Sequence, residues 1–419
     1  MERVKVMRNG NRAEENNSLS VSTELQDDLI VRDIISRLPL KFVVQCKVVS
    51  KNFNSCISDP KFSQTLLQRE MDCSTQLIYT LNGLRKFHKI SLNPIPTTCK
   101  MTLPDDVELL ASCKGLILFD FDEIKVYSVF NPITGAHQLI PYLPTTFMMI
   151  GYPGLAVDYS SSDQYKLVTI SKLAKNPNPF YKFHVISSKR SGLWREIQLR
   201  SNTFSDLAVG SPPVYWRDSL YWLRSDVSVI AFDTKREEAI ILDRPEFIDD
   251  CNIIYGKILT GRDIWLGVAQ GLLTLVCIFE KSIVIADYAR SNWSVSHTLD
   301  NFISGTDGII NGFPVLIDSK QVFFMVEHPL AMYHVYEYDT ENSEYRKAAV
   351  SSIVSYPLHS FQPTLASVHA TPLEIVNTRH LSYISAKLDV FRRFITEGVS
   401  DQEEESSSES SSSSAEEVV

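Results

Sequence analysis

The stretch "KVYSVFNPITGAHQLIP" (Lys125 to Pro141) contains the unit from which most of this 419-residue chain is built. An apolar run ends at Phe130, a turn rich in Asn, Pro and Gly follows, and a second apolar run begins at once. Short β-prone runs separated by such turn residues predict two antiparallel strands joined by a tight turn. The stretch therefore predicts a β-hairpin.

The same pattern recurs along the chain at intervals of about fifty residues. Copies are found at Leu77 to Leu92, Lys125 to Pro141, Phe183 to Leu199, Ser228 to Leu242, Ser282 to Leu299 and His334 to Ala348. A further apolar run, such as "SLYWL" from Ser219, precedes most of the copies. Units of three or four strands with this period are typical of propeller blades. The sequence therefore predicts an all-β, propeller-like body of about six blades.

The stretch from Gln26 to Phe62 has a different pattern, with Leu, Ile and Val at helical spacing. Asp27 and Asp28 are suited to begin a helix that runs to about Leu38, and the proline that follows ends this helix and can begin the next. Ser50 is a candidate cap for a third helix. Three short helices bury too little surface to offset chain entropy, so this head is expected to need a partner.

The two ends of the chain are predicted to lack a folded core. Residues 1–22 are polar, and residues 397–419 form an acidic Ser/Glu tail that is too poor in apolar groups to fold. Between the body and this tail, apolar residues at three- and four-residue steps predict an amphipathic helix over 379–396; they are Leu381, Ile384, Leu388, Phe391 and Ile395. The remaining segments are a head at 23–70 and a body at 71–378.

Charge and composition exclude several classes of protein. The net charge is −9, and residues 401–419 account for −7 of it through Asp401 and six Glu, which leaves no basic excess for binding nucleic acid. Apolar runs such as "GLLTLVCIF" from Gly271 are too short to span a bilayer. The first twenty residues lack the features of a secretory signal, so we expect a cytoplasmic or nuclear protein that binds neither membrane nor nucleic acid.

No pattern in the sequence indicates catalysis, a metal or a cofactor. The seven cysteines form no C-x-x-C pair, and His328 and His334 have no third ligand in register. The paired acids Asp105-Asp106 and Asp249-Asp250 are expected in solvated turns. Glycine-rich phosphate loops and known nucleophile motifs are absent from the sequence. The five tryptophans are expected to pack between blades.

The helical head resembles an F-box, the module that joins substrate receptors to Skp–cullin–F-box ubiquitin ligases. The resemblance rests on the Leu25 start, "DLIVRDIISRLPLK", "VVQCKVVSKNF" and "ISDPKF", in the order and spacing of plant members. The sequence departs from the pattern at Gln26, where proline is usual, and at Phe53, where many members have tryptophan.

The body is similar to the F-box-associated domain of plant F-box proteins, which is related to kelch-type propellers. The matching motifs are "SCKGLILF", "VFNPITGAHQLIP", "GLAVDYSSSDQYKLV", "LWREI" and "SLYWL". The similarity extends over roughly Leu77 to Ala370 and is weakest in its last third.

These resemblances imply a non-catalytic substrate receptor that binds a Skp-type adaptor, and through it a cullin, and presents a protein target for ubiquitination. The positions that match the adaptor-binding residues of an F-box are Leu25, Leu29, Ile30, Ile34, Leu38, Pro39, Val44, Val48 and Phe53. Substrate-binding residues are not identified by any motif. Inter-strand loops are candidates, among them Lys175 to Phe180 and Gly305 to Pro314.

Two alternatives to a general substrate receptor are compatible with the sequence. Kelch-like bodies also occur in proteins that bind glycans or other small ligands. Pollen self-incompatibility receptors share this head and body with other F-box proteins.

Overall fold

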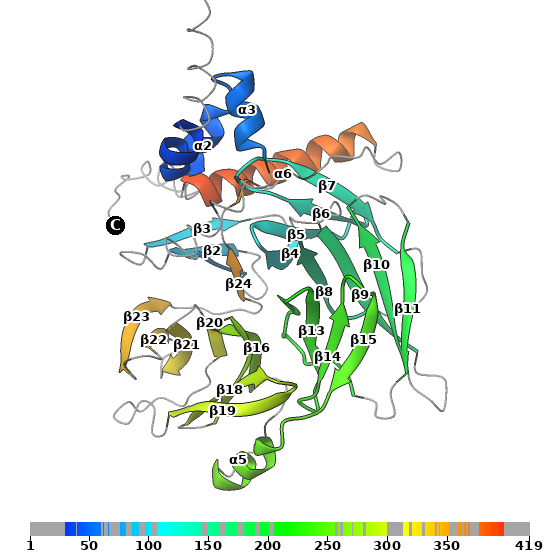
Figure 1. The fold of residues 1–419 in the computed structure, drawn as a ribbon, viewed down its shortest axis with the longest axis vertical. Coiled ribbons are helices and arrows are strands. Elements are labelled where there is room, and N and C mark those ends of the chain that lie inside the picture. Colours follow the sequence, from blue (N-terminus) through cyan, green and yellow to red (C-terminus); the bar gives the residue numbers. More distant parts are fainter. Residues whose placement is uncertain are drawn as a thin grey trace, which may run out of the picture.

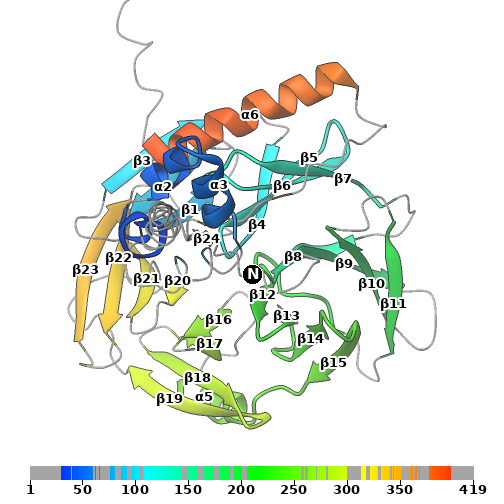
Figure 2. The same ribbon diagram turned by 45° about the horizontal axis from the view of Figure 1, so that its top comes forward.

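The computed structural model shows a helical head attached to a ring of β-sheets (Figures 1 and 2). The prediction of a helical head followed by a β-rich body is confirmed. No helix in the described part of the chain is long and apolar enough to cross a membrane. The structure describes residues 30–38, 40–59, 62, 66, 76–80, 86–91, 97–102, 107–143, 149–158, 165–173, 180–188, 193–200, 205–255, 259, 263–269, 271–279, 282–299, 313–317, 321–328, 332–339, 342, 344–351, 358–361, 364, 365, 368 and 377–397.

The described residues of the body form six sheets, each of four antiparallel strands. The first sheet has the order β24-β1-β2-β3, and the others follow the chain as β4–β7, β8–β11, β12–β15, β16–β19 and β20–β23. The strands of the first three sheets in chain order are β1 (Gln76–Thr80), β2 (Lys86–Ser91), β3 (Thr97–Thr102), β4 (Val107–Cys113), β5 (Leu116–Phe121), β6 (Val126–Phe130), β7 (His137–Pro141), β8 (Met149–Val157), β9 (Tyr165–Leu173), β10 (Phe180–Ser187) and β11 (Arg195–Arg200).

The other three sheets extend the same arrangement around the ring. Their strands are β12 (Val214–Trp216), β13 (Ser219–Leu223), β14 (Val229–Asp233), β15 (Glu238–Leu242), β16 (Ile264–Ala269), β17 (Leu272–Ile278), β18 (Ile283–Ala289), β19 (Asn292–Leu299), β20 (Phe313–Ile317), β21 (Gln321–His328), β22 (Met332–Asp339), β23 (Glu344–Ser351) and β24 (Leu358–Phe361). Each hairpin that the sequence predicts forms the third and fourth strands of a sheet, except the first and faintest copy. That copy becomes β1 and β2, the second and third strands, because β24 is the first strand of that sheet.

Side chains of Asn and Asp stabilise the repeated hairpin turns. Asn131 Oδ1 accepts hydrogen bonds from the backbone N–H of Ile133 at 2.9 Å and of Thr134 at 3.3 Å. At the equivalent place in another sheet, Asp233 Oδ1 accepts from Lys235 and Arg236, both at 2.8 Å. These short side chains bond to the backbone two and three residues further on, which favours a turn over continued strand.

The ring closes by pairing one of its first strands with its last. Gln76 of β1 lies opposite Phe361 of β24, and Tyr79 lies opposite Leu358. The innermost strands β24, β4, β8, β12, β16 and β20 then contact one another in this order around the ring. The sheet edge that β1 would otherwise expose is therefore covered by the end of the body.

Tryptophans connect neighbouring sheets, as the sequence predicts. Trp194 Nε1 donates to the carbonyl oxygen of Pro141 at 3.1 Å. Trp222, which is buried, donates to the carbonyl oxygen of Tyr152 at 3.0 Å. Both bonds join one sheet to the sheet before it. The large rings fill the space between sheets while their N–H groups stay hydrogen-bonded.

A second kind of link between sheets is ionic. Glu237, in the turn between β14 and β15, accepts from Lys166 of β9 at 3.0 Å and from Arg195 of β11 at 2.7 Å. All three side chains are mostly withdrawn from solvent. This network joins the sheet β8–β11 to the sheet β12–β15.

The turns of the sheets lie on two opposite rims of the ring. We call head-side rim the turns between the first and second strands and between the third and fourth strands of each sheet, because Ile133 of the β6–β7 turn packs against the head. We call α5-side rim the other turns and the links between sheets, which include α5 (Phe247–Tyr255). In Figure 2 the head lies in front of the ring and α5 behind it.

The C-terminal helix α6 (Thr378–Glu397) packs along the outside of the sheet β4–β7 (Figures 1 and 2). The ring of Phe391 meets that of Phe119 edge-on, with centroids 4.8 Å apart. Leu381 belongs to the predicted apolar stripe, but its side chain is 37% exposed and not buried against the body. The side chains that α6 buries are Ile384, Leu388, Phe391, Phe394 and Ile395.

The head consists of short helical segments that pack partly on the body. They are η1 (Ile30–Ile34), η2 (Ile35–Arg37), α2 (Leu40–Cys46) and α3 (Lys51–Ile57). As predicted, Ser50 caps α3, since its Oγ accepts the N–H of Phe53 at 3.0 Å. The expectation that only another protein would complete the head is wrong in part. Leu365 of the body is buried in the same cluster as Ile35, Val43 and Ile57.

The packing of α6 predicts that Phe391→Ala will destabilise the protein by about 3–5 kcal/mol, because the large cavity would be lined by buried side chains. Urea unfolding followed by far-UV circular dichroism measures this loss. Leu381→Ala, on the exposed side of the same helix, is the matched control and should cost less than about 1 kcal/mol. Equal losses for both variants would contradict the observed orientation of α6.

Candidate functional site

The head exposes a set of apolar side chains that its own packing does not cover. Val48 is 88% exposed and Ile34 is 57% exposed, values normal for charged residues and unusual for aliphatic ones. Among the head residues whose exposure is described, the set is Ile30, Ile34, Leu38, Phe42, Val48 and Val49. A group of exposed apolar side chains on a segment of about twenty residues marks an interaction surface.

The structure separates the predicted adaptor-binding residues into two groups. Ile30, Ile34, Leu38 and Val48 belong to the exposed set. Val44 and Phe53 are half-buried and pack against the cluster inside the head, so they support the surface more than they form it. The other three predicted residues, Leu25, Leu29 and Pro39, lie outside the described residues.

Two exposed residues, Phe42 and Val49, were missed as adaptor-binding candidates. Both belong to the apolar stripe that the sequence shows between Pro39 and Ser50. Periodicity identifies such a stripe but does not say which of its residues face the body and which face solvent. That division depends on how Leu365 and Ile133 approach the head.

The predicted substrate loops lie largely outside the described residues. In Lys175 to Phe180 only the last residue is described, as the first residue of β10, and in Gly305 to Pro314 only Phe313 and Pro314 are described, within β20. One loop joins the second and third strands of its sheet, and the other joins two sheets. Both loops therefore connect strand ends at the α5-side rim, away from the head.

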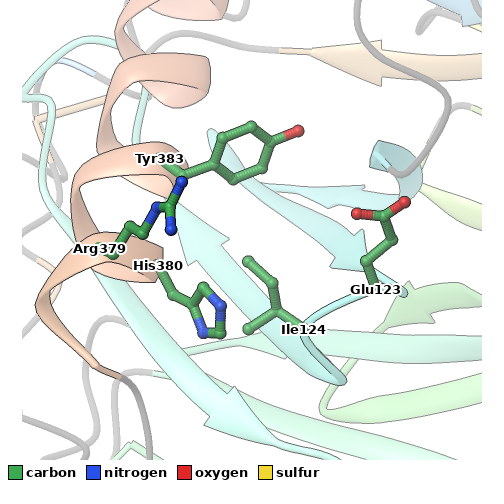
Figure 3. Close-up of a pocket in the computed structure, with 5 residues that line it drawn as sticks. All are labelled: Glu123, Ile124, Arg379, His380 and Tyr383. Carbon is green, nitrogen blue, oxygen red and sulfur yellow. The ribbon is translucent and has the colours of Figure 1, made fainter.

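A cavity of about 300 Å³ lies between the start of α6 and the β5–β6 turn (Figure 3). Arg379, His380 and Tyr383 come from α6, and Glu123 and Ile124 come from the turn. Figure 3 shows Ile124 between the helix and Glu123. The N-terminus of α6 is already capped, because Asn377 Oδ1 accepts the N–H of His380 at 2.9 Å. The lining holds a cation, an acid and two aromatic rings but no arrangement for nucleophilic attack.

A group of acids and tyrosines lies beside this cavity, on the other side of the β5–β6 turn. Tyr142 donates its hydroxyl hydrogen to Asp120, and its ring packs on that of Tyr127 at 4.7 Å. Lys125 Nζ forms an ion pair with Asp122 at 2.6 Å. Burial raises the pKa of Asp120 to about 6, against the lowering effect of the Tyr142 hydrogen bond. Asp120 therefore keeps its proton to a higher pH than an exposed aspartate does.

The described residues show no metal site and no catalytic arrangement. No three His, Cys, Asp or Glu side chains among them are placed to hold a metal. Burial raises the pKa of the Cys113 thiol to about 11, so this thiol is not an activated nucleophile. Asp249 and Asp250 are exposed to solvent as predicted, but the prediction of a turn is wrong, because both lie in the first turn of α5, where carboxylates favour a helix.

Two protein-family models match this chain, one over the head and one over the first part of the body. Residues 27–65 match the model described as "F-box domain", and residues 68–249 match the model described as "F-box associated beta propeller domain". The second match ends within α5, so the sheets β16–β19 and β20–β23 lie beyond it.

Similar proteins occur in Arabidopsis thaliana. F-box protein CPR1 is 26% identical, over 64% of this chain and 72% of its own length. A putative F-box/kelch-repeat protein, At1g20940, is 21% identical over 88% of this chain and 95% of its own length. Among solved structures, a chain of a nidogen/laminin complex matches with a TM-score of 0.38 and 12% identity, over 69% of this chain and 99% of that chain.

The raised pKa of Asp120 predicts a pH dependence of stability. The folded state holds this proton more tightly than an unfolded chain, in which the carboxyl has its usual pKa of 3.8. Wild-type protein should therefore lose up to about 2–3 kcal/mol of stability from this group as pH rises from about 4 through 6. Asp120→Asn should remove that loss in urea unfolding measured across this pH range.

The control for this experiment is Asp249→Asn, which removes an exposed acid from α5. It should leave the pH dependence between 4 and 6 as in the wild type. An Asp120→Asn protein with the wild-type pH dependence would contradict the assignment of this titration to Asp120.

Proposed function

Because the chain contains an F-box domain followed by an F-box-associated beta propeller domain, we propose that it is the substrate-recognition subunit of a Skp–cullin–F-box ubiquitin ligase. The observation that carries the proposal is the exposed apolar set on the head. F-box proteins are in general non-catalytic, and the described residues offer no chemistry of their own. Action in the cytoplasm or the nucleus follows from this proposal.

The head would bind a Skp-type adaptor through its exposed apolar set. Burial of apolar surface is worth about 25 cal/mol per Å², so a few large side chains would supply several kcal/mol. Ile34 and Val48 are the strongest candidates because they are the most exposed members from two different segments of the head. Val44 and Phe53 would hold that surface in shape through their packing inside the head.

The body would hold the target protein near the ubiquitin-charged enzyme, which accelerates transfer through proximity. We take each of the six sheets as one blade. We also place the end of the head at about residue 70 and the end of the body at about residue 378. The packing of the head on Leu365 supports a fixed orientation between the two parts. A fixed orientation would restrict where on the target ubiquitin can be attached.

Adaptor capture tests this proposal directly. Ile34→Lys combined with Val48→Lys should abolish co-purification with a Skp-type adaptor, because two charges would be buried against an apolar partner. The free energy of unfolding in urea should change by less than about 1 kcal/mol, since both side chains are exposed in the free protein.

The matched control is Ile240→Lys, which places the same charge on an exposed isoleucine of β15 in the body. It should leave adaptor capture intact. Undiminished capture by the double variant of the head, or equal loss in the control, would count against adaptor binding through this surface.

A further inference from the structure

The head-side rim carries a cluster of cations and aromatic rings that adaptor binding does not use. We call it the cation–aromatic cluster; its members are Lys114, Tyr215, Trp216, Arg217 and Lys235. Lys114 comes from the sheet β4–β7 and the other four from the sheet β12–β15. The cluster therefore joins two sheets that are not consecutive in the ring, near its inner strands.

Tight turns hold Lys114 and Arg217, the two central cations of the cluster, at the head-side rim. Lys114 and Gly115 join β4 to β5 with φ values of 44° and 80°, and Arg217 and Asp218 join β12 to β13 with φ values of 43° and 65°. Two successive residues with positive φ form the hairpin turn that matches the twist of the strands. These short turns present both side chains from a rigid backbone, and both are exposed.

Each central cation lies over an aromatic ring. Lys114 Nζ is 5.0 Å from the centroid of Tyr215, and Arg217 Cζ is 4.5 Å from that of Trp216. The Trp216 ring is itself fixed, because its Nε1 donates to the carbonyl oxygen of Gly271 at 2.8 Å. A guanidinium stacked on a ring keeps its N–H groups available for a carboxylate.

Acids near the cluster offset only part of its charge. Asp218 pairs with Lys235 at 2.7 Å, and both side chains remain substantially exposed. Asp158, which is half-buried, lies near Lys235 and Tyr215, and Asp233, which also lies near Lys235, pairs with Arg236 at 4.0 Å. Glu237 on the same rim is already bound by Lys166 and Arg195. With Arg236, Lys166 and Arg195 included, the described cations in and beside these turns outnumber the described acids, so this part of the rim keeps a positive charge that an acidic partner can meet.

Among the described residues, the opposite rim carries more acids than cations. Lys125 and Arg244 are paired there with Asp122 and Asp249. The acids described on the α5-side rim are Asp122, Glu123, Asp206, Asp226, Asp243, Glu246, Asp249, Asp250 and Asp263. A negatively charged segment would be repelled from that rim and attracted to the cation–aromatic cluster.

We propose that the cation–aromatic cluster binds an acidic peptide segment of the target protein. The proposal rests on the proposed function and names the class of target that the body takes. Trp, Tyr and Arg are the residues that most often dominate the binding energy of protein interfaces. Because the cluster lies on the head-side rim, the bound segment would be on the same side of the ring as the adaptor.

The test uses the full chain bound to its adaptor and two fluorescein-labelled peptides of equal length. One peptide is rich in Glu with a central Phe, and the other replaces each Glu by Ser. Fluorescence anisotropy at low ionic strength should show that the Glu-rich peptide binds at least about tenfold more tightly, with an advantage that falls as salt is added. Equal binding of the two peptides would overturn the proposal.

Charge reversal locates the binding surface. Lys114→Glu combined with Arg217→Glu should weaken binding of the Glu-rich peptide at least about tenfold. The control is Lys125→Glu, which makes the same change in a positive-φ turn of the opposite rim and should alter binding less than about twofold. If the double variant unfolds, Arg217→Ala alone tests the cluster and should lower the affinity for the Glu-rich peptide about threefold. Equal effects on both rims would overturn the proposal.

Adaptor capture and removal of the acidic tail complete the test of the cluster. All these variants should still capture the adaptor, so loss of peptide binding with adaptor capture intact concerns the cluster alone. Failure of the wild-type chain to capture the adaptor would instead contradict the proposed function. If the Glu-rich peptide binds only after residues 398–419 are removed, the occupant is the chain's own acidic tail, which would overturn the proposal of a target segment.

Discussion

The pairing of β24 with β1 is the interaction on which the rest of this structure depends. It joins residues 358–361 to residues 76–79 and so turns a row of sheets into a closed ring. It also brings the chain that follows β24 to the head-side rim, where Thr364 and Leu365 are buried. Asn131 donates from its Nδ2 to the carbonyl oxygen of Thr364 at 3.1 Å, which fixes this segment to the β6–β7 turn. The surface of the body on which the head packs is therefore built from parts of the chain more than two hundred residues apart.

The sequence predicts the repeated hairpins well because their causes are local. Asn131 and Asp233 bond to backbone groups two and three residues away, and such turns need no information from the rest of the fold. The apolar stripe of α6 is predicted for the same reason. It fails at Leu381, which is 37% exposed, because periodicity alone does not say which apolar residues of a helix the body covers.

The candidate surfaces are less predictable because exposure depends on contacts between distant segments. Phe42 and Val43 are neighbours in the sequence and both apolar, yet the first is half exposed and the second is buried in the cluster with Leu365. The cation–aromatic cluster has no sequence signature at all. Lys114 and Tyr215 are far apart in the chain and belong to different sheets. The arrangement of the sheets in a ring brings Lys114 Nζ to 5.0 Å from the centroid of the Tyr215 ring.

Because the last strand closes the ring, the fold can be completed only after that strand has been synthesised. During synthesis the helical head leaves the ribosome first, but Leu358 to Leu365 are made only after all the other strands. A chain that ends at a premature stop codon before this point would contain the whole head but would lack Leu365, on which the head packs. The edge of β1 would also be left unpaired. Such a fragment would be prone to aggregation, so translation must pass residue 365 before the ring can close and the head can pack on it.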